Sequence, residues 1–350
     1  MNYSLNCAPI RHIPPGSGLG KYRGKIGFNI FSASIVNREI KRQANELGLE
    51  KTQEYTKALS AALDDSGYSK KEKVLKLINN FSERLALCFY NMKIYYTDAE
   101  TFEGAWEKET ARQLLSCKKI IVGGGLAAGS FGKNLIAGTN RLLAQWGIDL
   151  QVERFIYPQY MPLLGCISLC PDGEAAVFDF GQTYSKGFLV KAQGETVYIK
   201  PLKKIESKWV KRKYLLRSQQ KKEALLLNEY IQDYICSCLE KSLFSKNTDL
   251  TVVVSLAAYM DENGGLGKDG AYGKMEIYIP GYCEYLQKEL RRKTGYHISM
   301  RMVGDQTAAA LAVPVFPEAS DMLIVTLGTA FAIQEPVGIA HVNRTEMVIE

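Results

Sequence analysis

The sequence has no run of apolar residues long enough to cross a lipid bilayer. Its longest apolar runs, such as residues 250–260, fall well short of the roughly 20 residues that a transmembrane helix needs. Residues 1–16 also lack the basic start followed by an apolar stretch that is typical of a signal peptide. We therefore expect no membrane partner and a cytoplasmic location.

Clustered metal ligands are lacking as well. The eight cysteines are scattered, and the close pairs, Cys166/Cys170 and Cys236/Cys238, have no second pair or histidine at zinc-site spacing. A chain of 350 residues can bury a large core without disulfide staples. We therefore expect reduced, structural cysteines, and the length suggests about two domains.

Charge is concentrated in one segment. Residues 200–222 hold ten Lys or Arg and one Glu, so this run alone carries a charge of +9. The whole chain has a net charge of +7, so the remaining residues together carry about −2. Trp209 and Tyr214 inside the run would suit nucleic-acid binding. The favoured interpretation is a solvated strand end and helix outside the ligand site, because the apolar residues of the run fit one side of a helix. Nucleic acid is therefore the disfavoured partner.

The pattern of apolar residues changes along the chain. Spacings of three and four residues predict helices over 35–47, 52–63, 70–90 and 103–117. Strands are then predicted over 118–125, 150–156, 175–180, 185–191, 196–201, 250–256 and 297–303, with strand, turn and strand over 321–333. Helices are predicted between them over 130–146, with Ser130 as its cap, and over 161–170, 211–241, 281–293 and 307–313. Residues 175–201 read as an antiparallel meander, and the alternation as a whole predicts an α/β fold.

Three glycine-bearing turns each follow a predicted strand, which is where α/β folds bind ligands. In Asp179-Phe180-Gly181-Gln182-Thr183, the glycine lets the backbone approach an anion, and Asp179 can hold Mg²⁺ through water. The N–H groups of Gly328-Thr329-Ala330 could cradle another phosphate. The third turn offers a flat backbone surface to a base or ribose and comprises Gly123, Gly124, Gly125, Leu126 and Ala127. Taken alone, a glycine after a strand is more often a plain tight turn.

Asp305 follows the strand predicted over 297–303 and precedes the helix predicted over 307–313. An Asp at such a position is commonly a helix N-cap. It is also well placed as a general base, because a loop at a strand end faces the ligand cleft and a carboxylate can take a proton from a hydroxyl group. Position alone favours the cap interpretation.

Together these segments resemble the ATPase fold shared by actin, Hsp70 and sugar kinases, and most closely the ROK-family sugar kinases. AVFDFGQTYSKGFLV resembles the first phosphate motif, Asp-x-Gly-Gly-Thr-x-x-Lys: Asp179, Gly181, Thr183 and Lys186 match, while Gln182 replaces the second glycine. VGDQTAAALA resembles the segment with the catalytic aspartate, and also the Gly-Asp-Gln segment of FGGY sugar kinases. Both resemblances imply that Asp305 is the catalytic base. LIVTLGTAFAI resembles the second phosphate motif, and KKIIVGGGLAAG the adenosine motif. The ROK zinc motif is absent, and VVVSLAAYMDENGG lacks the family's Pro-Gly.

The order of these motifs differs from that of the families. In the families the order is first phosphate motif, catalytic base, second phosphate motif and adenosine motif, whereas here the adenosine motif comes first. The resemblance therefore implies a circular permutation, in which the N- and C-termini of the family's chain are joined near residues 170–175. It implies a two-lobed, actin-like, ribonuclease H-like fold: a larger nucleotide-binding lobe of residues 1–150 and 311–350, and a smaller lobe of 151–310 that holds the first phosphate motif and the catalytic aspartate. We expect Asp179, Thr329 and Gly124 to converge on one cleft.

The implied activity is an ATP-dependent kinase acting on a hydroxyl of a sugar or similar small molecule, with ATP and Mg²⁺ as cofactors and a homodimer left open. Asp179 would orient the metal, and Asp305 would take the proton. Two alternatives stay open. One is a non-catalytic sensor or scaffold, which Gln182 and Ala330 favour by replacing glycines of the phosphate motifs. The other is a nucleic-acid-binding protein that uses residues 200–222.

Overall fold

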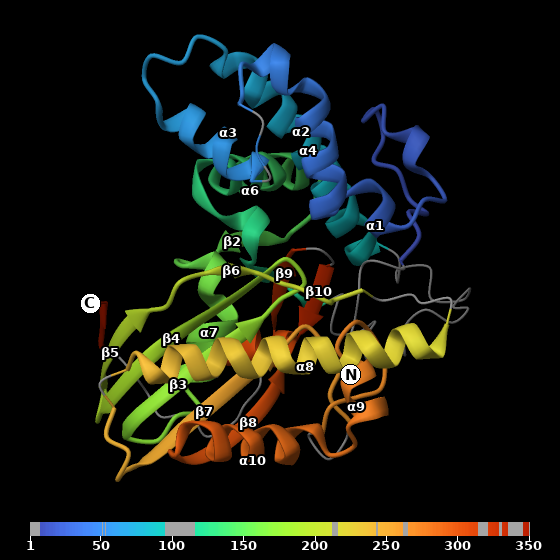
Figure 1. The fold of residues 1–350 in the computed structure, drawn as a ribbon. Coiled ribbons are helices and arrows are strands. Elements are labelled where there is room, and N and C mark those ends of the chain that lie inside the picture. The colour runs from blue at the N-terminus through green and yellow to red at the C-terminus, as the bar shows by residue number, and fades with distance from the viewer. Residues whose placement is uncertain are drawn as a thin grey trace. The chain divides into compact units, whose positions relative to one another are not determined.

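The chain folds into two compact units. The computed structural model describes residues 8–50, 52, 54–94, 116–211, 216–242, 244–261, 265–313, 321–328, 331–334 and 346–349. Unit 1 comprises Met1–Met161 and Val315–Pro336, and unit 2 comprises Pro162–Pro314 and Val337–Glu350. Figure 1 labels the elements of both units. The functions predicted for the two lobes, and the lobe boundaries at 150 and 310, stay a prediction.

Unit 1 opens with helices. They are η1 (Gly20–Tyr22), α1 (Gly27–Ile30), α2 (Ala33–Leu47), α3 (Tyr55–Asp64) and α4 (Lys71–Ile94). Helices α2, α3 and α4 confirm the predictions over 35–47, 52–63 and 70–90, and their apolar faces share one core with α6 (Gly129–Gln145). The Ser82 hydroxyl on α4 donates to the Leu135 carbonyl on α6 at 3.0 Å, so a buried polar contact fixes this pair of helices.

The sheet of unit 1 has the strand order β10-β9-β1-β2. Its strands are β1 (Lys119–Gly123), β2 (Gln151–Arg154), β9 (Met322–Leu327) and β10 (Phe331–Gln334). Strand β9 pairs antiparallel with β10 on one side and parallel with β1 on the other. The short helices η3 (Gly125–Ala127) and η4 (Pro158–Tyr160) follow β1 and β2.

The sheet of unit 2 has the order β11-β5-β4-β3-β7-β8, and β6 pairs with β4 beside this path. Its strands are β3 (Gly173–Phe180), β4 (Tyr184–Gln193), β5 (Thr196–Pro201), β6 (Ile205–Glu206), β7 (Asp249–Leu256), β8 (His297–Gly304) and β11 (Glu346–Ile349). The antiparallel pairs β3–β4 and β4–β5 confirm the predicted meander. Strands β7 and β8 then extend the sheet in parallel from the other side of β3. The predicted α/β class is confirmed at this level.

Helices cover the sheet of unit 2. They are α7 (Met161–Ile167), α8 (Arg217–Glu240), α9 (Gly273–Tyr278), α10 (Tyr282–Thr294) and α11 (Asp305–Leu311). Figure 1 shows α8 and α10 along one face, where they share a core with Phe178 and Phe180 of β3. The alternate β3 residues Val177 and Asp179 are buried too, so the other face is also covered. There, Gly165 of α7 lets the backbone of α11 approach at Ala308, since a Cβ at this glycine would lie 1.6 Å from the Ala308 carbonyl oxygen.

Two sequence predictions are wrong in detail. Ser130 does not cap α6, because the N-cap is Ala128, and the Ser130 hydroxyl donates to the Asp64 carboxylate. The helix predicted over 211–241 begins only at Arg217, and Lys211 is not helical. The helix predicted over 103–117 falls almost entirely outside the described residues.

The cysteines of the described residues are free thiols. Burial raises the pKa of Cys88 to about 12 and that of Cys117 to about 11, so both thiols stay protonated at neutral pH. Within the described part of the chain, no helix is both long and apolar enough to cross a membrane.

Candidate functional site

Asp179 lies at the carboxyl end of β3, where the chain changes direction across the sheet. From β3 the meander runs through β4 and β5 to one side, and the chain then crosses through α8 to β7 on the other side. In open α/β sheets, ligands bind outside the carboxyl ends of the strands at such a switch point. The position of Asp179 is therefore set by topology as well as by its local turn.

The Asp179 carboxylate is buried, with only 4% of the residue exposed. Its Oδ1 accepts a hydrogen bond from the Ser255 hydroxyl at 3.2 Å, and its Oδ2 lies 3.4 Å from the Lys186 ammonium group. Ser255 is the direct neighbour of Asp179 on the parallel strand β7, and Lys186 is its neighbour on the antiparallel strand β4. A buried carboxylate is costly unless it is paired and hydrogen-bonded, and both conditions are met here.

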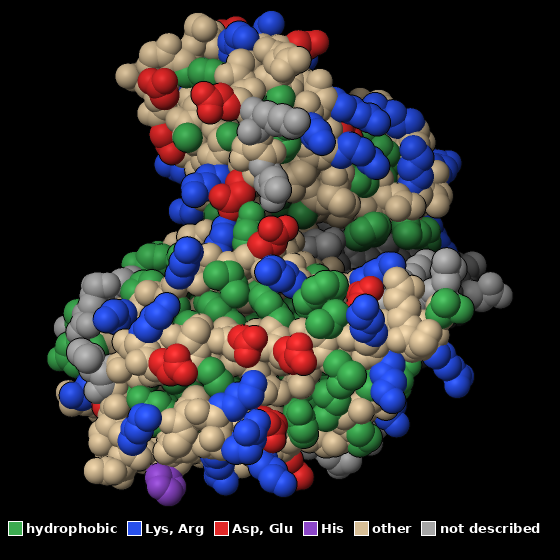
Figure 2. Space-filling view, in the orientation of Figure 1, with side chains coloured by type: hydrophobic (Ala, Val, Ile, Leu, Met, Phe, Trp, Pro, Cys, Tyr) green, Lys and Arg blue, Asp and Glu red, His purple; other side chains and the backbone are tan. Residues whose placement is uncertain are grey.

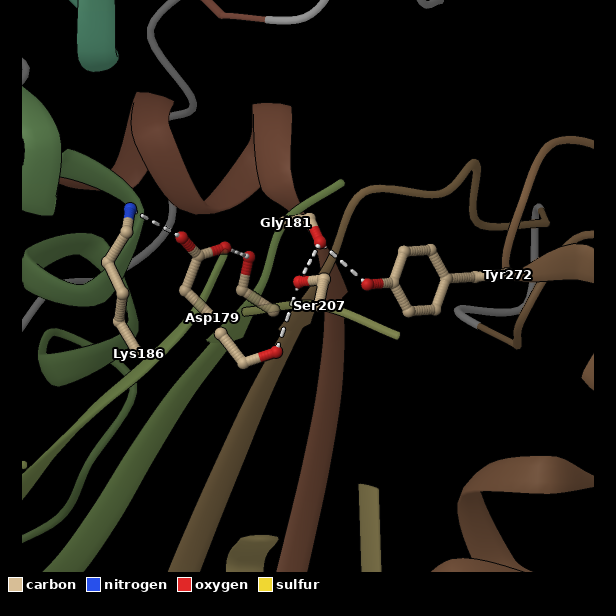
Figure 3. A network of polar contacts seen from close by, with 7 residues as sticks. Asp179, Gly181, Lys186, Ser207 and Tyr272 are labelled. Atoms are coloured by element: carbon tan, nitrogen blue, oxygen red, sulfur yellow. Dashed lines mark hydrogen bonds and ion pairs between the residues drawn. The ribbon is translucent and has the colours of Figure 1, made fainter. Parts of the chain in front are cut away.

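The turn that follows, Gly181–Thr183, is held in place by hydrogen bonds to its backbone. The Gly181 carbonyl accepts hydrogen bonds from the hydroxyl groups of Ser207 and Tyr272, each at 2.8 Å (Figure 3). The backbone N–H of Ser207 donates to the Thr183 carbonyl at 2.9 Å, and the Gly181 N–H donates to Tyr184 at 3.1 Å. The turn is thus fixed at the sheet edge, as a preorganised phosphate-binding turn requires.

Asp305 stands at the same edge of the sheet. It is the first residue of α11, directly after Gly304 of β8, which pairs with Leu256 of β7. Since β7 in turn pairs with β3, the ends of β8 and β3 are two strands apart, or roughly 10 Å. The cap reading is wrong, because Gly304 is the N-cap and no side chain caps this helix.

Tyr272 links the two aspartates electrostatically. Its side chain is fully buried, and burial raises the pKa of its hydroxyl well above the usual range. The negative charges of Asp179 and Asp305 raise this pKa further. The hydroxyl therefore stays protonated and keeps donating to the Gly181 carbonyl.

In unit 1, the strand ends that lead into the two remaining predicted turns lie side by side. Gly123 of β1 is paired with Thr326 of β9, so both turns begin at the same edge of the sheet. Gly124 has a φ of 91°, and a Cβ there would lie 2.4 Å from the carbonyl oxygen of Leu327, directly before Gly328. Thr329 and Ala330 lie outside the described residues, so their phosphate role stays a prediction, as does the convergence of Asp179, Thr329 and Gly124 on one cleft.

The residues of the predicted adenosine turn differ in how far they are exposed to solvent. Leu126 and Ala127 are buried and belong to the hydrophobic core of unit 1. Gly125 is exposed, and a Cβ at this position would meet nothing within 4 Å. A base or ribose would therefore rest on the part of the turn around Gly124 and Gly125.

The sequence predicts that the basic run lies outside the ligand site, but the middle of the run contacts the candidate phosphate turn. Ser207 belongs to this run and contacts the Gly181–Thr183 turn directly through its N–H and its hydroxyl. The lysines of the run are exposed in the described residues, so the solvated part of the interpretation is confirmed.

Sequence reasoning missed Ser207, Ser255, Tyr272 and Lys274. Ser255 gives the clearest signal, because it is a polar residue near the end of an otherwise apolar strand. The sequence gives no signal for Lys274, because lysine is almost never fully buried. Here it is 1% exposed, and its ammonium group donates to the carbonyls of Trp209 and, at 3.2 Å, Lys211.

Burial lowers the pKa of Lys274 to about 8, while the charge of Glu223 opposes this shift and that of Lys211 adds to it. Because the folded-state pKa lies below the usual 10.5, the unfolded chain binds more protons between these values, and this residue makes the protein more stable as pH rises from about 8 to 10.5. We expect the free energy of unfolding to rise by about 1 kcal/mol over this window relative to Lys274→Met, allowing for solvent screening. Urea unfolding of both proteins at pH 8 and 10.5 measures the difference, and parallel pH profiles would contradict it.

Comparisons with known proteins do not assign the chain to a family. No protein-family model matches it, and no curated protein matches it. One solved structure to which it is similar is the trans-2-enoyl-CoA reductase of Clostridium acetobutulicum in complex with NADH. That match has 11% identity and a TM-score of 0.19, and it covers 61% of this chain and 62% of the reductase. A TM-score this low does not indicate a shared fold, so the function has to be inferred from the site.

Proposed function

We propose that this protein is an ATP-dependent phosphotransferase that acts on a hydroxyl group of a sugar or a similar small molecule. One observation carries the proposal: Asp179 at the end of β3 and Asp305 directly after β8 lie at the same edge of one sheet, beside a fixed glycine turn. Phosphoryl transfer needs this set of parts, namely a carboxylate for the metal, a turn for the phosphates and a second carboxylate for the hydroxyl proton.

The topology of each unit supports the same proposal. In unit 2, β3 lies between an antiparallel and a parallel neighbour, and in unit 1 the same holds for β9. We take this mixed sheet order as compatible with the ribonuclease H-like fold that the resemblance to actin-like ATPases implies. The permuted, two-lobed arrangement is therefore part of the proposal.

The residues fit a nucleotide with its Mg²⁺. Among the described residues, no three His, Cys, Asp or Glu side chains lie close enough to form a metal site by themselves. Mg²⁺ that is bound with a nucleotide keeps several waters and takes only one or two protein carboxylates, so Asp179 alone suits this role. When bound, the ion would neutralise charge on the phosphate oxygens.

The protein groups would then act by position. Asp179 would orient the hydrated metal, and Lys186 beside it would supply a positive charge. The Gly181–Thr183 turn would present its backbone to the phosphates. Asp305 would accept the proton of the attacking hydroxyl group.

One observation favours a second candidate, a nucleotide- or sugar-binding sensor without turnover. Both oxygens of Asp179 already have partners in Ser255 and Lys186, and these partners compete with a metal ion for the carboxylate. Gln182 in place of the second glycine points the same way.

A screen for ADP release across a panel of sugars and polyols tests the proposal, with Mg-ATP binding measured in parallel by calorimetry. Sugar-dependent ADP release supports the kinase. Binding of Mg-ATP without release for any compound would favour the sensor, and failure to bind Mg-ATP at all would contradict both.

A further inference from the structure

A short basic segment is anchored beside the candidate phosphate turn. This segment, residues 203–211, is called the strap here. It pairs with β4 through β6, and the hydroxyls of Tyr230 and Tyr234 donate to its carbonyls at Glu206 and Lys203, both at 2.9 Å. The contacts of Ser207 with the turn and of Lys274 with Trp209 and Lys211 complete the anchoring.

The strap carries four lysines and one acidic residue, Glu206. Its lysines, which are all exposed, are Lys203, Lys204, Lys208 and Lys211. The Lys204 ammonium lies 3.6 Å from the centre of the Tyr184 ring, and Tyr184 is the residue that directly follows the Gly181–Thr183 turn. At least this cation of the strap therefore lies beside the turn.

An ordinary solvated loop does not require such anchoring. Burying Lys274 to hold the backbone of the strap carries a desolvation cost. Trp209 is held at a φ of 63°, a left-handed conformation that costs a non-glycine residue about 1–2 kcal/mol. Strain and buried polar groups of this kind cluster at functional sites, where they fix a geometry before a ligand binds.

From this geometry we infer that the strap binds phosphate groups of a small molecule held at the Gly181–Thr183 turn. The inference rests on the proposed function for its choice of site. The phosphates would belong either to the nucleotide or to a hydroxyl compound that is already phosphorylated, since the same cations would attract both.

A small ligand fits the surface better than a nucleic acid. Figure 2 shows the Lys and Arg side chains of unit 2 interspersed with hydrophobic and acidic ones on the face in view, without a continuous basic band among the described residues. Nucleic acids need a basic groove or stripe that follows the backbone over several nucleotides.

The test compares two double variants that remove the same charge. Lys204→Gln with Lys208→Gln changes the strap, whereas Lys221→Gln with Lys222→Gln changes two exposed lysines of the same basic run on α8. Calorimetry of the full chain measures the binding of inorganic tripolyphosphate, Mg-ATP, glucose 6-phosphate and glucose. The quenching of Trp209 fluorescence reports binding at the strap, with Trp209→Phe identifying its signal.

We expect the strap variant to bind tripolyphosphate about tenfold more weakly than the wild type, a usual effect of losing a charge-assisted hydrogen bond, and the α8 variant to change less than twofold. A matching loss with Mg-ATP identifies the nucleotide as the source of the phosphates, and a loss with glucose 6-phosphate but not glucose identifies the acceptor. Either result supports the inference. Unchanged melting temperatures show that the loss does not come from unfolding.

Equal losses in both double variants, no binding of any phosphate probe, or tighter and equally strap-dependent binding of a single-stranded oligonucleotide would each overturn the inference. The readout is separate from turnover. Strap-dependent phosphate binding without ADP release would contradict the kinase activity but support phosphate binding by the strap. ADP release with unchanged phosphate binding in the strap variant would support the kinase activity but contradict phosphate binding by the strap.

Discussion

Replacing Asp305 with asparagine should leave Mg-ATP affinity within a few-fold but lower phosphoryl transfer about a hundredfold or more, the usual scale for losing a positioned general base. Asparagine keeps the size and the hydrogen-bonding ability of the side chain, but it cannot accept the hydroxyl proton. Asp305 is the first residue of α11 and not its cap, so the stability loss should be at most about 1 kcal/mol, from the interaction of its charge with the helix N-terminus. ADP release and the melting temperature measure the two effects.

Asp249→Asn is the matched control. Asp249 is the exposed first residue of β7, so the same chemical change is made at the amino end of the sheet, away from the edge that holds Asp305. The control should keep full ADP release. Full activity in a folded Asp305→Asn protein would remove Asp305 from the mechanism.

Local patterns predicted the elements of this chain because each pattern reports a property of its own segment. The apolar strands over 175–201 were sufficient for the meander, whose register needs no distant information. Helix starts were less predictable. Asp305 and Ser130 are good N-caps by residue type, but glycine and alanine precede them at the observed caps, since the chain enters each helix one or two residues earlier.

In the candidate site, contacts between residues close in sequence could be predicted, whereas long-range contacts could not. Asp179 and Lys186 are seven residues apart and meet through a hairpin, whereas Ser255 reaches Asp179 across 76 residues of sequence. That contact depends on the parallel pairing of β3 with β7, which no local pattern encodes. The anchoring of the strap by Lys274 depends likewise on tertiary packing, and it contradicts the usual exposure of lysine.

Replacing Gly124 with alanine should destabilise unit 1 by about 3 kcal/mol and abolish Mg-ATP binding with it. Two costs add up at this position. A φ of 91° is unfavourable for any residue with a Cβ, and the new methyl group would lie 2.4 Å from the backbone oxygen of Leu327, which cannot move without disturbing β9. Strain and overpacking of this kind each cost about 1–3 kcal/mol. Urea unfolding and calorimetric titration with Mg-ATP measure the two losses.

Gly125→Ala separates the structural role of this turn from its proposed role in adenosine binding. Gly125 is exposed, its φ is not positive, and its added methyl group would meet nothing within 4 Å, so stability should change by less than about 0.5 kcal/mol. If a base or ribose rests on this backbone, the methyl group occupies its place, and Mg-ATP should bind about tenfold more weakly, as expected when overpacking costs about 1–3 kcal/mol. Unchanged Mg-ATP affinity in Gly125→Ala would place the adenosine elsewhere. A Gly124→Ala protein as stable as the wild type would show that β1 and β9 do not approach as closely at this turn.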